Sequence, residues 1–117
     1  MLNTYVEIVG DVSVVQCKGR IVHSDSVFRL RDVILSQGSS RVVVMDLSEV
    51  EAIEGGAVGM LSYLQRWAHD CEIKLKLFNP SGAVLERLEH TCMPSLDIAT
   101  TDELIALLEL AHEARAQ

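Results

Sequence analysis

Short runs of β-branched residues alternate along this chain with stretches whose hydrophobic residues have helical spacing. The first two runs cover residues 5–9 and 12–17, and Gly10-Asp11 lies between them. A two-residue connection that begins with glycine is typical of a tight β-hairpin, because glycine readily adopts the positive φ that the first turn position needs. The pattern therefore predicts an antiparallel pair of strands at the start of the chain.

A helix and a buried strand are expected after the hairpin. Val27, Leu30 and Ile34 recur at the interval of an α-helix. The helix that they predict covers residues 25–37. Residues 41–47 then form a run that is apolar throughout its centre, which is typical of a central strand covered on both faces.

The rest of the chain continues this alternation. In order, we expect a loop over residues 48–54, a helix over 56–69, a strand over 73–78, a helix over 82–91, a short edge strand over 93–98 and a helix over 101–115. Because strands alternate with helices after the hairpin, the later strands should run parallel. The predicted fold class is α/β: a mixed β-sheet, with an N-terminal antiparallel hairpin and then parallel strands, and about four α-helices packed mainly on one face.

Length and charge exclude several classes of protein. The 117 residues suit one domain, and neither a repeat nor a linker divides them, so we expect a single domain over residues 1–117. The 10 Lys and Arg residues against 17 Asp and Glu residues give a net charge of −7, which argues against binding to nucleic acid. No apolar run reaches the roughly 20 residues of a membrane span, and a signal peptide is not recognisable at the start. We therefore expect a cytoplasmic protein with no direct membrane insertion.

Side chains that could carry chemistry are few and scattered. The cysteines at positions 17, 71 and 92 show no disulfide or metal-binding spacing, and the glycine-rich nucleotide-binding motifs are missing. Asp46 and Ser48 could form an acid–hydroxyl pair, but such residues at a strand end more often satisfy backbone N–H groups. We therefore expect no enzymatic activity, no catalytic residue, no metal and no cofactor.

One segment resembles the signature of a known family. From Asp46 to Leu61 the chain reads D-L-S-E-V-E-A-I-E-G-G-A-V-G-M-L. This is similar to D-L-S-x-V-x-[FY]-[IM]-D-[ST]-[ST]-G-[LV]-G-x-L, the pattern of the STAS family, which is named after sulphate transporters and anti-sigma factor antagonists. The matching residues are Asp46, Leu47, Ser48, Val50, Ile53, Val58, Gly59 and Leu61. Gly19-Arg20-Ile21 and the segment from Asn79 to Leu88 resemble two further features, so the resemblance covers nearly the whole chain.

The chain departs from that pattern at the positions that matter most for regulation. In anti-sigma factor antagonists, a Ser or Thr of the D-[ST]-[ST]-G segment is phosphorylated by the partner anti-sigma factor, which is a kinase. Gly55 and Gly56 occupy these two positions here, and glycine has no hydroxyl that could accept a phosphate. Glu54 replaces the family's Asp, and Ala57 replaces the following Gly. The resemblance therefore implies the binding architecture, with the phosphoacceptor positions lost.

A second apolar stripe on the helix over 56–69 suggests where a partner binds. Met60, Tyr63 and Trp67 form this stripe, and such side chains are enriched at interfaces, although they could equally pack against a neighbouring helix. STAS domains generally meet partners through this helix and the loop before it. The predicted partner-binding residues are Asp46, Ser48, Glu49, Glu51, Glu54, Gly55, Gly56, Ala57, Met60, Tyr63 and Trp67. The four acids among them, with no Lys or Arg between Arg41 and Arg66, suggest a basic partner surface.

The resemblance implies a regulatory protein-binding module of the anti-sigma factor antagonist type. Its expected partner is an anti-sigma factor serine kinase or a related ATPase, which it would bind to regulate transcription without being switched by phosphorylation at the usual site. Two alternatives keep the fold: an accessory subunit of a lipid-trafficking ABC transporter, and a ligand-sensing module that uses the start of the helix over 56–69 as an anion or nucleotide site. The oligomeric state stays open.

Overall fold

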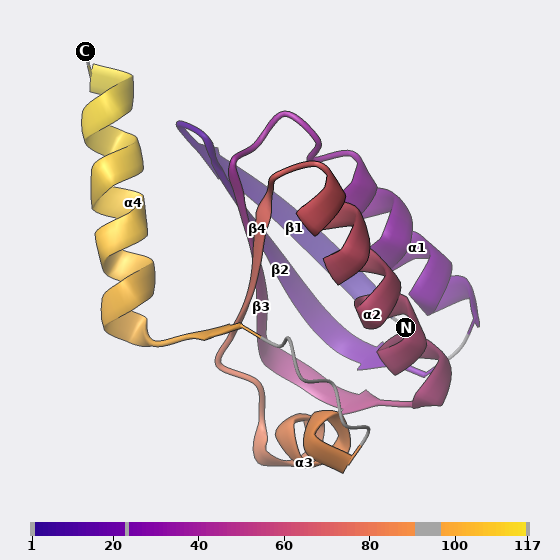
Figure 1. Cartoon of the computed structure of the whole chain (residues 1–117). Coiled ribbons are helices and arrows are strands. Elements are labelled where there is room, and N and C mark those ends of the chain that lie inside the picture. The colour runs from indigo at the N-terminus through magenta and orange to yellow at the C-terminus, as the bar shows by residue number, and fades with distance from the viewer. Residues whose placement is uncertain (1, 23, 91–96, 117) are drawn as a thin grey trace.

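The computed structural model describes residues 2–22, 24–90 and 97–116 of the chain. Strands and helices alternate through this part after the first hairpin (Figure 1). Their bounds are β1 (Leu2–Val9), β2 (Val12–Ile21), α1 (Ser24–Leu35), β3 (Val42–Ile53), α2 (Gly55–Asp70), β4 (Lys74–Phe78), α3 (Gly82–His90), β5 (Ile98–Ala99) and α4 (Thr101–Ala116).

The strands form one mixed sheet in the order β1-β2-β3-β4-β5. β1 and β2 are antiparallel, and every later pair of neighbours is parallel. The predicted fold class is therefore confirmed. The two-residue hairpin connection is also as expected, since Val9 pairs with Val12 and Gly10 has a φ of +58°.

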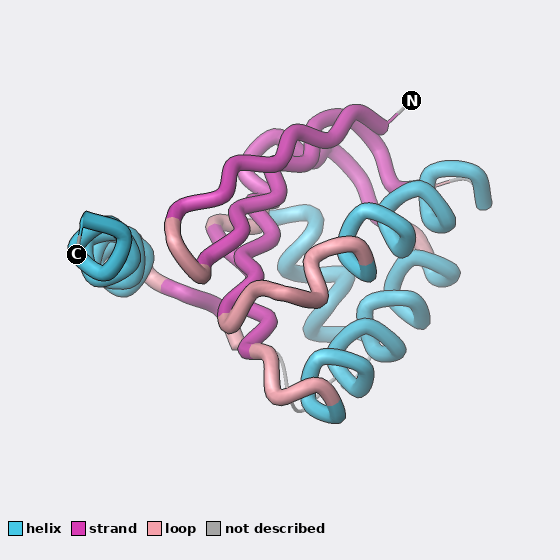
Figure 2. The backbone as a smooth tube through the Cα atoms, turned by 90° about the horizontal axis from the view of Figure 1, so that it is seen from above, coloured by secondary structure: helices cyan, strands magenta, loops and turns pink. Residues whose placement is uncertain are grey.

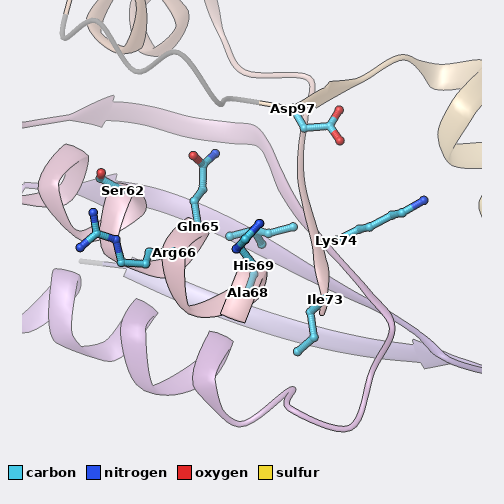
Figure 3. Close-up of a pocket in the computed structure, with 9 residues that line it drawn as sticks. Ser62, Gln65, Arg66, Ala68, His69, Ile73, Lys74 and Asp97 are labelled. Atoms are coloured by element: carbon cyan, nitrogen blue, oxygen red, sulfur yellow. The ribbon is translucent and has the colours of Figure 1, made fainter. Parts of the chain in front are cut away.

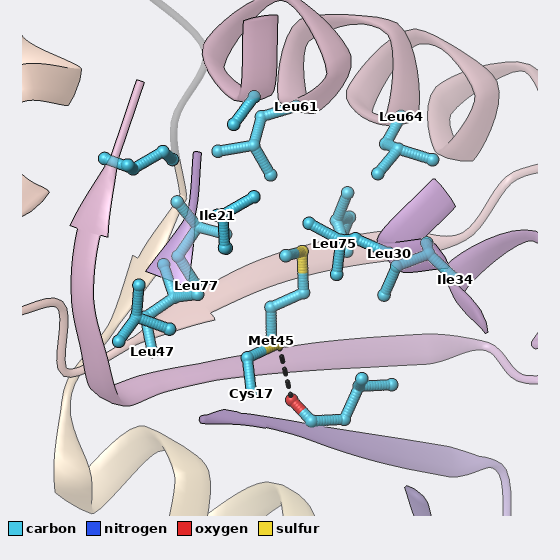
Figure 4. Packing of buried hydrophobic residues seen from close by; sticks show 14 of the residues in the cluster. Cys17, Ile21, Leu30, Ile34, Met45, Leu47, Leu61, Leu64, Leu75 and Leu77 are labelled. Carbon is cyan, nitrogen blue, oxygen red and sulfur yellow. Dashed lines mark hydrogen bonds between the residues drawn. The ribbon is translucent and has the colours of Figure 1, made fainter. Parts of the chain in front are cut away.

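The main hydrophobic core lies between one face of the sheet and helices α1, α2 and α3. Leu30 and Ile34 of α1 and Leu61 and Leu64 of α2 are fully buried there, facing Met45 at the centre of β3 (Figure 4). Helix α3 adds two buried residues, Val84 and Leu88, to the same cluster. These residues recur at helical spacing in each helix and alternate in each strand, so the residue pattern directly produces this layer.

Helix α4 lies on the opposite face of the sheet, well separated from α1 and α2 (Figures 1 and 2). Leu104, Leu107 and Leu108 of this helix pack against a smaller buried cluster, whose members are Val12, Val42, Val44 and Ala111. Thr100 caps the start of this helix, because its Oγ1 accepts a hydrogen bond from the Glu103 N–H at 3.1 Å. The helices thus pack mainly, but not entirely, on one face.

One predicted element is wrong. The loop expected over residues 48–54 is largely strand, since β3 continues to Ile53 and pairs with β2 as far as Ile21. Two irregularities in this pairing disturb the apolar alternation, which is why the sequence pattern indicated a loop. The expected edge strand over 93–98 falls partly outside the described residues, and the strand described there is β5.

Gly10 makes the closest approach between the hairpin and α4. A Cβ atom at this position would lie 2.6 Å from the carbonyl oxygen of Ala111, which is closer than real side chains come. The positive φ of Gly10 is also costly for any residue with a side chain. Both the turn conformation and the close contact with α4 therefore require glycine at position 10.

We predict that Gly10→Ala lowers the free energy of unfolding by about 2–4 kcal/mol, because it adds left-handed backbone strain to a steric clash. Urea denaturation followed by circular dichroism measures this change. The matched control is Gly59→Ala inside α2, where no atom lies within 4 Å of the added methyl group. This control should stabilise the protein by about 0.5–1 kcal/mol. Equal stability of the two variants would contradict both the strained turn at Gly10 and its contact with α4.

Candidate partner-binding site

The carboxyl half of β3 bulges away from β2 just after the buried centre of the sheet. Gln16 pairs with Asp46 and Lys18 pairs with Glu49, so one residue of β2 opposes two residues of β3. A carboxylate oxygen of Asp46 (Oδ1) accepts hydrogen bonds from the backbone N–H and from the hydroxyl of Ser48, at 3.0 and 2.5 Å. Asp46 and Ser48 therefore stabilise the bulge locally, as the simpler interpretation of this pair predicted.

A second irregularity follows three residues later. Gly19 pairs with Val50 and Arg20 pairs with Ala52, which leaves Glu51 as an extra residue on β3. Gly19 adopts a φ of +116° beside this point, a conformation that favours glycine. As a result Ser48, Glu49 and Glu51 are all exposed although the strand continues.

A shallow groove lies beside the two bulges. Its lining residues are Asn3, Lys18, Gly19, Ser48, Glu49, Val50, Glu51, Ser81 and Ala83. The side chain of Gln16 donates a hydrogen bond to Glu49 at 3.4 Å. Ser81 attaches α3 to this region, because its hydroxyl donates to the Val50 carbonyl at 3.3 Å. The groove thus joins the carboxyl ends of β2 and β3 to the start of α3.

The buried thiol of Cys17 lies opposite the first bulge (Figure 4). Burial, together with a smaller repulsion of the thiolate by the nearby Asp46 carboxylate, raises the pKa of this thiol to about 12. A thiol with such a pKa stays protonated at neutral pH, so Cys17 is not a nucleophile. Its contribution to the site is packing.

Helix α2 begins where β3 ends, and Glu54 is its N-cap residue. The Glu54 N–H donates to the Ile21 carbonyl at 3.2 Å, which connects the helix start to the end of β2. The Glu54 carbonyl accepts from Ala57 and Val58 at 2.9 and 3.2 Å, but its side chain forms no capping hydrogen bond. The exposed carboxylate instead lies near the positive end of the helix dipole, where a negative charge is favourable.

Gly56 is exposed on the first turn of α2. A Cβ atom there would meet nothing within 4 Å, and the φ of Gly56 is outside the left-handed region. Neither packing nor backbone geometry therefore requires glycine at this position. A serine would fit without a clash.

Helix α2 has one buried face and one partly exposed flank. Ala57 is fully buried with the sheet-facing residues, so it is not itself available for contact. Met60 and Trp67 are half-buried against the main core, whereas Tyr63 is 52% exposed. The stripe thus packs against the core through Met60 and Trp67 and leaves Tyr63 accessible, while its contact with a partner stays a prediction.

Phe28 on α1 adds an exposed aromatic ring that the sequence pattern did not single out. It is 49% exposed, and the Arg31 guanidinium lies 5.0 Å from the centre of its ring. Helices α1 and α2 contact each other. Phe28 lies away from the buried residues Val27, Leu30 and Ile34 of the same helix, so its exposure follows from the helical period.

The other flank of α2 lines a polar groove against β4 (Figure 3). Arg66 and His69 of the helix and Lys74 of the strand project around it. Asp97 lies at its far side and forms an ion pair with Lys76 at 2.8 Å. This basic flank contrasts with the acidic end of β3 and contains none of the predicted partner-binding residues.

The structure therefore divides the predicted site into two neighbouring groups. Ser48, Glu49 and Glu51 lie on the bulged half of β3, while the glycines at 55 and 56 and the apolar stripe lie on α2, and Glu54 connects the groups. Among the described residues no cluster of His, Cys, Asp and Glu could hold a metal ion. Within the same residues, no helix is long and apolar enough to cross a membrane.

Solved anti-sigma factor antagonists share this fold. The unphosphorylated form of SpoIIAA is 19% identical over 92% of this chain and 96% of its own, with a TM-score of 0.75. An anti-sigma factor antagonist from Mycobacterium paratuberculosis is 22% identical over 91% of this chain and 93% of its own, also with a TM-score of 0.75. The murine anion transporter Slc26a9 contains a similar region, with 14% identity and a TM-score of 0.69, which covers 89% of this chain and 18% of the transporter. None of the curated proteins matches the sequence.

The family follows from the sequence match. The model of the STAS domain matches residues 3–104, so the chain belongs to the STAS domain family. This confirms the resemblance to the STAS family that the segment from Asp46 to Leu61 indicated. STAS proteins of the anti-sigma factor antagonist type are generally not enzymes.

We predict that Asp46→Ala destabilises the protein by about 1–2 kcal/mol, because the Ser48 N–H loses its charged acceptor. Ser48→Ala keeps that backbone hydrogen bond and should cost only about 0.5 kcal/mol. Chemical denaturation of both variants tests the comparison. A larger cost for Ser48→Ala would contradict the role assigned to Asp46 in the bulge.

Proposed function

We propose that the chain is a regulatory protein-binding domain that captures an anti-sigma factor and so regulates transcription. The observation that carries this proposal is the exposed start of α2, which has the STAS architecture but no hydroxyl at Gly55 or Gly56. Binding through this surface would not be interrupted by phosphorylation at these positions. The partner is an anti-sigma factor kinase or a related ATPase. Phosphorylation at Gly55 or Gly56 cannot release this partner, because neither residue has a hydroxyl.

The apolar part of the surface supplies the binding energy. Tyr63 is accessible, and Met60 and Trp67 are fixed at their base by the main core. Aromatic side chains that are held rigidly in this way lose little entropy on binding and often dominate an interface. Phe28 on α1, beside Arg31, offers a partner a further exposed aromatic side chain.

The acidic part of the surface selects the partner by charge. Glu49, Glu51 and Glu54 are exposed around the end of β3. Carboxylates in this arrangement favour a partner that presents Lys or Arg, and they accelerate association more than they strengthen the final complex. The association rate should therefore fall as the ionic strength rises.

A second candidate function has one observation in its favour. The similar region of Slc26a9 is part of a transporter chain, so this fold also occurs in transport proteins. By analogy, the same surface would bind the ATPase of a lipid-trafficking ABC transporter as an accessory subunit. Co-purification from the native host with such an ATPase, and with no anti-sigma factor, would select this second function.

We predict that Tyr63→Ala weakens binding to the cognate anti-sigma factor at least about tenfold, because an exposed aromatic anchor is lost. Calorimetric titration against the anti-sigma factors of the host measures the affinity. Ser62→Ala is the matched control, since Ser62 is exposed on the opposite flank of the same helix. Circular dichroism should show an unchanged fold in both variants. If Tyr63→Ala left the affinity unchanged, or if Ser62→Ala lowered it equally, the apolar stripe would not be part of the interface.

We further predict that Gly56→Ser converts the domain into a kinase substrate. The first turn of α2 has room for this side chain, so incubation with the partner kinase and ATP should add one phosphate and weaken the complex. Intact mass spectrometry measures the product, with Gly82→Ser at the start of α3 as the control that should gain none. A phosphate on the unsubstituted protein, mapped to another hydroxyl such as that of Ser48, would refute the lost switch.

A further inference from the structure

Strand β1 forms an open edge of the sheet. It pairs with β2 along its whole length without a bulge, and within the described residues no strand pairs with its other side. Figure 2 shows it running from the N-terminus along the outer rim of the molecule. Three of its large hydrophobic side chains are strongly exposed: Tyr5 at 58%, Val6 at 42% and Ile8 at 59%.

This edge lacks the features that usually protect an exposed strand. Residues 2–9 include no Pro, Gly, Lys or Arg, and their only charged side chain is that of Glu7. An eight-residue edge of this kind is a template for pairing with another strand. Something that covers it would remove both unpaired backbone groups and exposed apolar surface from water.

The hairpin geometry determines which backbone groups are available. In a two-residue hairpin the closing pair, here Val9 and Val12, is hydrogen-bonded, and hydrogen-bonded pairs then alternate along the strand. The N–H and C=O groups of Thr4, Val6 and Ile8 consequently point away from β2. A hydrogen bond from the Arg29 side chain agrees with this alternation. Its Nη1 donates at 3.2 Å to the carbonyl of Leu2, which therefore also points away from β2.

We propose that a second copy of this chain covers the edge, with the two β1 strands antiparallel and Tyr5 on the two-fold axis. Thr4 of each copy then pairs with Val6 of the other through their outward backbone groups. The two Tyr5 side chains meet as a directly opposed, non-hydrogen-bonded pair, in which Cα atoms lie about 4.5 Å apart. Aromatic cross-strand pairs of this kind stabilise a sheet.

Charge complementarity selects this register. Glu7 of one copy faces Asn3 of the other, and Asn3 is itself paired with Lys18 on β2. Glu7 and the other copy's Lys18 then lie on the same face with Cα atoms about 10 Å apart, within reach of two long side chains. A register centred on Val6 would instead place Glu7 opposite Tyr5 and Gln16, where it meets no cation.

Sedimentation velocity on the complete chain, over a range of concentrations, tests the proposal. A dimer should appear as concentration rises, and Glu7→Lys or Lys18→Glu alone should weaken it about tenfold by opposing like charges. The double variant exchanges the charges and should restore the dimer. A monomer at every concentration up to about 1 mM, or a double variant no better than the single ones, would overturn the proposal.

Two further variants test the register without depending on charge. Val6→Pro removes an outward N–H and leaves the pairing with β2 intact, so it should weaken the dimer about 30-fold through two lost hydrogen bonds. Tyr5→Cys should form an intermolecular disulfide under mild oxidation, because the opposed Cα atoms lie within disulfide distance. The unsubstituted chain serves as the control for its native cysteines. Unchanged dimerisation of Val6→Pro, or no disulfide beyond that control, would overturn the proposed pairing.

Discussion

The candidate site depends on the first half of β3, residues 42–46, which is paired with β2 and β4 and largely buried between the two layers of helices. Water does not reach this half of the strand, so its backbone groups must be satisfied within the sheet. Val43 and Met45 bury one side of it in the main core, while Val42 and Val44 bury the other beneath α4. The position of α2, which begins directly after β3, is determined by this constraint.

The two bulges expose the second half of β3, whose first half is buried. A regular strand would continue to alternate buried and exposed residues, whereas the bulges expose Ser48, Glu49 and Glu51 while Val50 stays buried. Hydrogen bonds from Ser48 to Asp46 lower the free-energy cost of the first bulge, because the carboxylate supplies the acceptor that the bulged backbone needs. Acidic groups thus reach the surface at the groove near the start of α3 without leaving the sheet.

The fold could be predicted from the sequence wherever the hydrophobic period was regular. The hairpin, the helices and the buried centre of β3 all follow from local spacing. The loop expected over 48–54 was wrong because a bulge depends on the pairing partner in β2, which local spacing does not reveal. The sequence pattern also could not predict that α4 packs on the opposite face of the sheet. The period of an amphipathic helix shows which side of the helix is buried, but not which face of the sheet it covers.

The candidate site could be predicted only in part, for similar reasons. Glu54 was singled out because it lies in the segment that resembles a family signature, and Tyr63 and Trp67 because they belong to an apolar stripe just beyond it. Their role in partner binding stays a prediction. Phe28 was not singled out because it lies outside both the segment and the stripe, on the exposed side of α1. Ala57 was predicted to bind the partner because of the family resemblance, but it is buried where α2 packs on the sheet.

Hydrogen–deuterium exchange of the domain, with and without its cognate anti-sigma factor, tests the central claim most directly. Exchange reports local opening and solvent access of each backbone amide, so it maps the contact without any substitution. The account predicts that the partner slows exchange over residues 46–67, from the first bulge through the apolar stripe of α2, and leaves α4 unchanged. Slowing confined to α4 or to the polar groove between α2 and β4 would contradict it.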